Sequence, residues 1–198
     1  MAAEKLSIRA CANVSPLPSR PCMTGERMEV VVYPDPRLLR KTSAVGEITD
    51  EIRARVAEMA RIMYEDRGVG LAAPQVGWSV RLFVMNPTGD PREPAQETVM
   101  VNPRLLKRSG HVSGEEGCLS FPGIYVEVER AKNVVIQWTD LDGKPHEEAW
   151  SEWPARIFQH EYDHLENVLL VHRMNAAQKI QHAEALAELR ENYADQEA

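Results

Sequence analysis

The stretch QHEYDH, residues 159–164, constrains this chain more than any other part of the sequence. Its two histidines, His160 and His164, are four residues apart, a spacing that places both side chains on one face of a helix. Such a pair can bind a metal ion, and the carboxylate of Glu161 beside it can transfer protons. A catalytic metal site typically has three protein ligands and one position for water. The fold must therefore bring a third ligand to this helix from elsewhere.

Length and composition favour one globular domain. The chain has 198 residues, of which 43% are hydrophobic and 27% charged. No apolar run approaches the roughly 18 residues that a membrane span needs, so we expect no membrane partner. The net charge of -7 argues against broad binding of nucleic acid, and we expect no DNA partner. Three cysteines suit a reducing compartment, which predicts a cytoplasmic protein.

The chain divides into three predicted segments. Residues 1–27 lack hydrophobic periodicity and are predicted to form a flexible extension. They are either a transit peptide, which would place the protein in an organelle matrix or stroma, or the result of a start codon placed too early, with Met28 the true start. Residues 28–175 are predicted to form the catalytic domain. Residues 176–198 are predicted to form a C-terminal helix and tail.

Hydrophobic patterns predict an α+β fold in which mixed or antiparallel sheets surround a central helix that bears the HExxH motif. The clearest helix begins after Thr49, a plausible N-cap, and ends near Gly68. A short strand is expected from Met28. Further strands are expected at 80–85, 97–102, 124–130, 133–140 and 146–150, with a hairpin turn at 140–145.

Three residue types compete as the third metal ligand. Glu184 follows His164 by 20 residues, the offset of thermolysin-like proteases, although a solvated face of an acidic helix explains it equally well. A third histidine is excluded, because Leu170 and Asn167 occupy the positions where that motif has histidine and glycine. Cys118 lies in EEGCLSFPG, a composition typical of a loop that presents its thiol. A lone cysteine is more often a small buried residue.

Three motifs together resemble the signature motifs of peptide deformylases, and they occur in the same order. They are GVGLAAPQ at 68–75, EGCLS at 116–120 and QHEYDH at 159–164. The resemblance extends from about residue 29 to about residue 174. The residues in and around these motifs are most similar to those of organellar deformylases and their bacterial relatives.

The resemblance implies that Cys118, His160 and His164 hold one divalent metal ion. The family typically uses Fe²⁺, and the same ligands accept Zn²⁺, Ni²⁺ or Co²⁺. The implied reaction is hydrolysis of the N-formyl group from the formyl-methionine of newly made polypeptides, which releases formate. The implied partners are therefore formylated nascent chains, with transient proximity to the ribosome. A metal-bound water would be the nucleophile, and Glu161 would act as general base and then as general acid.

The resemblance also implies roles for residues in the first two motifs. The side-chain amide of Gln75 and the backbone N–H of Leu119 would stabilise the oxyanion. Without the resemblance, Gln75 would be interpreted as an ordinary surface amide. The backbones of Val69 and Gly70 would bind the peptide main chain, and Gly117 would line the cleft.

Residues around the third motif are open to two interpretations. Ile157 and Trp153 would line a pocket for the methionine side chain, or would pack in the core. Asp163 would orient a metal ligand, or would be exposed or have a helix-packing role. His172 would be a spare ligand or a surface residue. Asn167 stands where deformylases usually have glycine, so we expect it to adopt a left-handed conformation past the helix end.

Two other functions remain open on the residues alone. The first is a zinc endopeptidase with His160, His164 and Glu184 as ligands. The second is an inactive module that binds a metal ion or a peptide.

Overall fold

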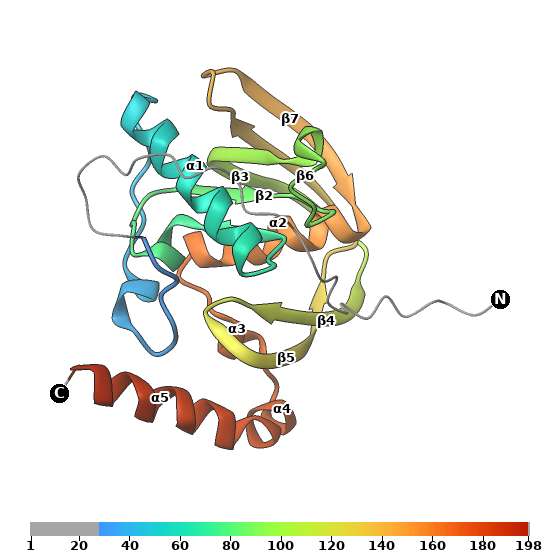
Figure 1. Ribbon diagram of the computed structural model, residues 1–198. Helices are drawn as coiled ribbons and strands as arrows, with labels where there is room; N and C mark the ends of the chain where they lie inside the picture. Colours follow the sequence, from blue (N-terminus) through green and yellow to red (C-terminus); the bar gives the residue numbers. More distant parts are fainter. Residues whose placement is uncertain (1–27, 198) are drawn as a thin grey trace.

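The computed structural model describes residues 28–197, shown in Figure 1. The predictions for residues 1–27 lie outside this part of the chain. Within residues 28–197, no helix combines the length and the apolar character that crossing a membrane requires.

All paired strands are antiparallel and form two sheets. The larger sheet has the strand order β1-β2-β3-β6-β7, and β4 and β5 form a separate hairpin. The strands are β1 Gly70–Ala72, β2 Leu82–Met85, β3 Thr98–Ser109, β4 Val112–Cys118, β5 Phe121–Arg130, β6 Asn133–Thr139 and β7 Pro145–Ser151.

The helices are interspersed with these strands and gather again at the C-terminal end. The α-helices are α1 Asp50–Glu65, α2 Glu152–Leu165, α3 Leu170–Arg173, α4 Ala176–Gln181 and α5 Ala183–Glu197. The 3-10 helices are η1 Pro36–Leu39, η2 Ala73–Val76 and η3 Pro94–Gln96. Thr49 caps α1 as predicted, because its side chain accepts a hydrogen bond from the N–H of Ile52.

The larger sheet lies between α1 and α2. Leu82 and Val84 belong to the apolar cluster that α1 completes, whereas Phe83 and Met85 belong to the cluster that α2 completes. Since side chains alternate along a strand, β2 is buried on both faces. The other side of α2 faces the β4–β5 hairpin, so this helix lies between the two sheets (Figure 1). This arrangement confirms the single α+β domain with antiparallel sheets around the motif-bearing helix.

The C-terminal helix packs against the hairpin. Leu186 of α5 is buried with Val126 and Val128 of β5, and α5 runs along the outer side of β5 (Figure 1). The C-terminal helical segment is divided at His182 into α4 and α5, whereas one continuous helix was predicted. The division of the chain at residues 175 and 176 stays a prediction.

Three local predictions were wrong. The segment from Met28 forms no strand, because the N–H groups of Val31 and Tyr33 donate to two different elements, at Gln75 and Ser120. The strand predicted at 97–102 is also longer than expected, because β3 continues to Ser109. Its pairing with β6 shifts register around Pro103 and then resumes.

The third wrong prediction concerns the surroundings of Cys118. This residue ends a strand, β4, and does not lie in a loop. The segment VSGEEGC has low strand propensity, but it forms a strand because it pairs with β5 along its whole length. Tertiary pairing therefore outweighs local composition here.

Asn167 follows the end of α2 in the left-handed conformation, as predicted, with φ of 59°. Its side-chain amide also donates to the carbonyl oxygen of Arg40 at 2.9 Å. We expect Asn167→Ala to lower the free energy of unfolding by about 1–2 kcal/mol, because alanine tolerates this conformation poorly and lacks the amide. Asn167→Gly should lose less stability, because glycine adopts the left-handed conformation without strain and lacks only the amide. Urea unfolding measures both, and an equal loss in the two variants would contradict this explanation.

Candidate metal centre

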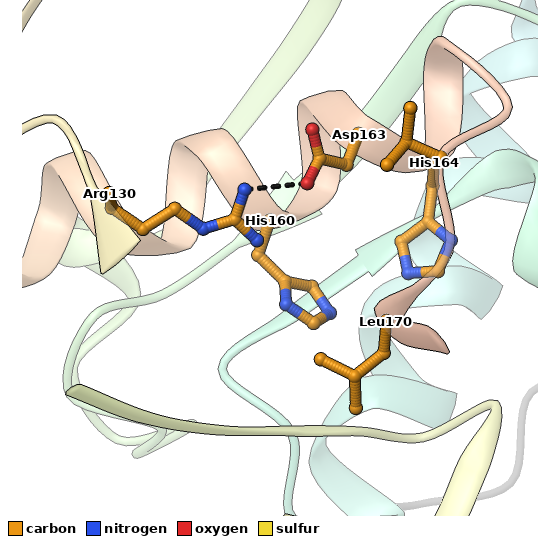
Figure 2. A pocket seen from close by; sticks show the side chains of 6 residues that line it. Arg130, His160, Asp163, His164 and Leu170 are labelled. Carbon is orange, nitrogen blue, oxygen red and sulfur yellow. Dashed lines mark hydrogen bonds and ion pairs between the residues drawn. The ribbon is translucent and has the colours of Figure 1, made fainter. Parts of the chain in front are cut away.

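The three predicted metal ligands converge between α2 and β4. The ligand atoms of Cys118, His160 and His164 all lie within 4.8 Å of one another. The thiol sulfur of Cys118 is 3.4 Å from Nε2 of His164. Figure 2 shows both imidazole rings on the same side of α2, as the spacing of four residues requires. These residues form the metal-binding triad predicted from sequence.

The donor set fits a divalent metal ion. One thiolate and two imidazoles supply three ligands and leave a fourth position open, which is the arrangement of catalytic sites. Nδ1 of His160 is 3.0 Å from Oε2 of Glu116, so its Nε2 is available to a metal. Burial lowers the pKa of His164, which favours the neutral imidazole that coordinates metals.

Glu116 is the functional residue that sequence reasoning missed. Its carboxylate accepts a hydrogen bond from Nδ1 of His160, which fixes the ring orientation and the tautomer of a metal ligand. A signal was available, because Glu116 lies two residues before Cys118 and therefore faces the same side of a strand. That signal was hidden by the prediction of a loop at this position.

Asp163, the residue named from sequence as a partner for a ligand, has other contacts. Its carboxylate accepts a hydrogen bond from Arg130 at 2.5 Å (Figure 2). It also accepts one from Arg173. Asp163 therefore belongs to a buried ion-pair network and reaches the metal ligand only through Arg130 and Glu116.

Glu161 lies on the neighbouring face of α2 and is buried. Its Oε2 atom has no hydrogen-bond partner among the described residues. Burial raises the pKa of this carboxyl to about 7. The carboxylate lies directly against the backbone of Gly70, where an added Cβ atom would be 2.4 Å from Oε1. A buried carboxylate with an unpaired oxygen next to a triad of metal ligands is placed to exchange a proton with a bound molecule.

Gln75 also reaches the triad, from η2. Its side chain is 1% exposed, so it is not a surface amide. Its Oε1 accepts from the N–H of Ala72, and its Nε2 lies 3.4 Å from the sulfur of Cys118 and 3.2 Å from the hydroxyl of Ser120. The hydrogen bond that Oε1 accepts from Ala72 therefore directs the NH₂ group of the same amide toward the metal site.

The predicted substrate-binding residues lie on both sides of this centre. Gly70 begins β1, a strand at one edge of the larger sheet, and Val69 directly precedes it. Gly117 precedes Cys118 on β4, and an added Cβ atom there would be 2.8 Å from the ring of Tyr125. Leu119 follows Cys118 and lies beside Gly68.

The two predicted pocket residues differ in burial. Ile157 is 3% exposed and belongs to the cluster between α2 and the sheet. Trp153 is 41% exposed, and its indole N–H donates to the carbonyl oxygen of Pro87. Their contact with a methionine side chain stays a prediction.

The competing ligands lie elsewhere. Glu184 is exposed on α5, a helix that packs against β5, and it does not belong to the cluster around His160 and His164. Nδ1 of His172 accepts a hydrogen bond from the N–H of Leu169 and caps α3. Neither residue completes the metal site.

The fold and the site together define a metal-dependent hydrolase, whose Cys-His-His site is formed by the HExxH helix α2 and the end of strand β4. The comparisons identify the family within that class. The family model described as polypeptide deformylase matches residues 27–180, and the chain belongs to this family.

Similar proteins come from plants, bacteria and a protozoan. "Peptide deformylase 1B, chloroplastic/mitochondrial" of Arabidopsis thaliana is 47% identical over 74% of this chain and 54% of its own length. A peptide deformylase of Acidobacterium capsulatum is 42% identical over 76% of this chain and 88% of its own. The chain thus spans only 54–62% of the length of the plant relatives it matches.

Solved structures agree with this assignment. A plant peptide deformylase crystal structure is 42% identical, with a TM-score of 0.84 over 89% of this chain and 96% of that chain. The peptide deformylase of Plasmodium falciparum is 37% identical, with a TM-score of 0.83 over 86% of this chain and 99% of that chain.

Proposed function

We propose that this protein removes the N-formyl group from the N-terminal formyl-methionine of newly made polypeptides and releases formate. The observation that carries the proposal is the buried carboxylate of Glu161, which has an unpaired oxygen beside the Cys118, His160 and His164 triad. The names of the relatives, peptide deformylases of plants and bacteria, support the same substrate.

The proposed hydrolysis adds water to the formyl carbon and breaks the C–N bond to the methionine nitrogen. A divalent ion held by the triad would polarise the formyl oxygen and make water acidic near neutral pH. Glu161 would accept one proton from the attacking water and deliver it to the leaving amine. The pKa of about 7 of the Glu161 carboxyl suits both the uptake and the release of this proton at neutral pH.

The oxyanion that develops on the formyl oxygen needs hydrogen-bond donors. We assign this role to the Nε2 amide of Gln75 and the backbone N–H of Leu119. The bond from the N–H of Ala72 to Oε1 holds the Gln75 amide in one orientation, so the donor is prearranged. Prearranged donors stabilise the transition state without a reorganisation cost.

The substrate main chain would add to the outer edge of β1. The backbone groups of Val69 and Gly70 would bind it as an extra strand, with Gly117 on the opposite side of the cleft. Recognition of main chain is tolerant of sequence, as an enzyme acting on many nascent chains requires. Ile157 and Trp153 are the proposed contacts of the methionine side chain.

Gly70→Ala tests the placement of Glu161. The new methyl group would occupy the space of the Glu161 carboxylate, because that Cβ position is 2.4 Å from Oε1. We expect formate release to fall by about 10²-fold or more, while the metal content stays at the wild-type value. Gly46→Ala is the control, since an added Cβ there meets nothing within 4 Å. Wild-type activity in Gly70→Ala would contradict this placement.

For the metal we propose Fe²⁺, with Zn²⁺, Ni²⁺ or Co²⁺ as alternatives for the same ligands. Ferrous iron and a thiolate ligand are both sensitive to oxidation. Metal analysis after anaerobic purification should find about one iron per chain. One zinc per chain under the same conditions would contradict the choice of Fe²⁺ and favour the Zn²⁺ alternative.

For the partners we propose formylated nascent chains, met by the protein close to the ribosome. For the compartment we propose the cytoplasm, with an organelle matrix or stroma as the alternative. The bacterial relatives support the first, and the plant relatives named as chloroplastic support the second. The N-terminal residue of the natural protein, read by mass spectrometry, distinguishes a processed transit peptide from a start at Met28.

A further inference from the structure

Arg156 is a buried arginine on α2, one turn before the metal ligand His160. It is 6% exposed, and its guanidinium reaches across to the β4–β5 hairpin. There it donates to the carbonyl oxygens of Val112 at 2.8 Å, Val128 at 2.9 Å and Gly114 at 3.3 Å. A buried guanidinium is costly unless its donors are paired, and this one binds the backbone of both strands.

The same guanidinium also binds the carboxylate that orients His160. Nη1 of Arg156 is 2.7 Å from Oε1 of Glu116, while Nε and Nη2 of Arg130 contact both oxygens of that carboxylate. The remaining contact of Glu116 is the one to Nδ1 of His160. Two arginines therefore fix the carboxylate in the position from which it holds the metal ligand.

The hairpin leaves space for this guanidinium at one residue. A Cβ atom added to Gly114 would be 3.0 Å from Nη2 of Arg156 and 3.1 Å from Cζ. That contact is tighter than ordinary van der Waals contact, and the guanidinium cannot easily move because its acceptors hold it. The glycine in β4 and the arginine in α2 are therefore matched to each other across the two elements.

We infer that Arg156 is a positioning residue of the metal centre, which keeps the helix of His160 in register with the strand of Cys118. The two ligands come from different elements, and Arg156 is a direct cross-link between them next to the site. The inference rests on the metal triad and not on the proposed substrate. Its test can therefore fail or succeed separately from the deformylase proposal.

The test measures the rate at which Co²⁺-loaded protein loses its metal to an excess of chelator, followed by the visible spectrum of the cobalt–thiolate site. We expect Arg156→Gln to accelerate metal loss by about 10–100-fold, the usual effect of losing a partner that supports a metal ligand. Arg156→Lys should be intermediate, because an ammonium can bind Glu116 but cannot also span the carbonyl groups. Gly114→Ala should accelerate the loss in the same direction by a smaller factor.

Arg173→Gln is the matched control. Arg173 pairs with Asp163 in the same network but does not contact Glu116. This variant should lose stability in urea and release cobalt at the wild-type rate. If Arg173→Gln accelerates metal loss as much as Arg156→Gln does, the effect is general destabilisation and the inference is wrong.

Gly114→Ala keeps the test decisive if Arg156→Gln does not fold, because it retains the arginine. Wild-type rates of metal loss and an unchanged cobalt spectrum in Gly114→Ala and in every folded variant at position 156 would also overturn the inference. Arg156 would then support only the packing of α2.

Discussion

Replacing Cys118 with serine is expected to reduce bound metal from about one ion per chain to a trace. The sulfur of Cys118 lies 3.4 Å from Nε2 of His164, in a triad where it is the only anionic ligand. A serine hydroxyl stays protonated near neutral pH, and metal ligands must be deprotonated. Two imidazoles alone do not close a catalytic site.

Glu184→Ala is the comparison that separates two functions. A thermolysin-like endopeptidase would need Glu184 as its third ligand, but this residue is exposed on α5. We expect Glu184→Ala to keep full metal content after dialysis, measured by atomic spectrometry. Full metal in Cys118→Ser together with loss of metal in Glu184→Ala would reject the site described above.

Replacing Glu161 with glutamine is expected to lower the rate of formate release by about 10²–10⁴-fold, the usual contribution of a general base. Glutamine has the same shape but cannot accept the proton. Metal content should not change, because Glu161 is not one of the triad. Steady-state kinetics with formyl-Met-Ala-Ser and metal analysis of the same samples measure both quantities.

Glu166→Gln provides the control on the same chain segment. Glu166 caps the end of α2, where its exposed carboxylate pairs with Arg81 at 2.7 Å. We expect this variant to keep wild-type activity, since it removes a carboxylate that does not belong to the site. Equal loss of activity in both variants would indicate damage to α2 rather than removal of a base.

The helix and its histidine pair could be predicted locally, because a spacing of four residues is enough to place His160 and His164 on one face. The choice of Cys118 could not be made from local chemistry. It depends on a long-range contact between β4 and α2, and only the order of three motifs indicated it. The local reading of a loop at Cys118 was wrong, because strand pairing with β5 overrides a composition rich in glycine and glutamate.

The supporting residues were harder to predict, for a related reason. Glu116 and Arg156 are charged residues that would ordinarily be assigned to the surface. They are buried because Glu116 pairs with both Arg156 and Arg130, across α2, β4 and β5. The hydrophobic periodicity of the sequence does not indicate such a network. Asn167, by contrast, was predictable, because the requirement for a left-handed residue after a helix is local.

The most direct test of the central claim is a mass balance on formyl-Met-Ala-Ser incubated with the metal-loaded protein. Liquid chromatography with mass spectrometry would follow the peptide, and an enzymatic assay would follow formate. We predict one formate for each Met-Ala-Ser formed, with the Met–Ala and Ala–Ser bonds intact. Cleavage of either peptide bond without formate would identify an endopeptidase, and an unchanged peptide would identify an inactive binding module; either result would contradict the proposed function.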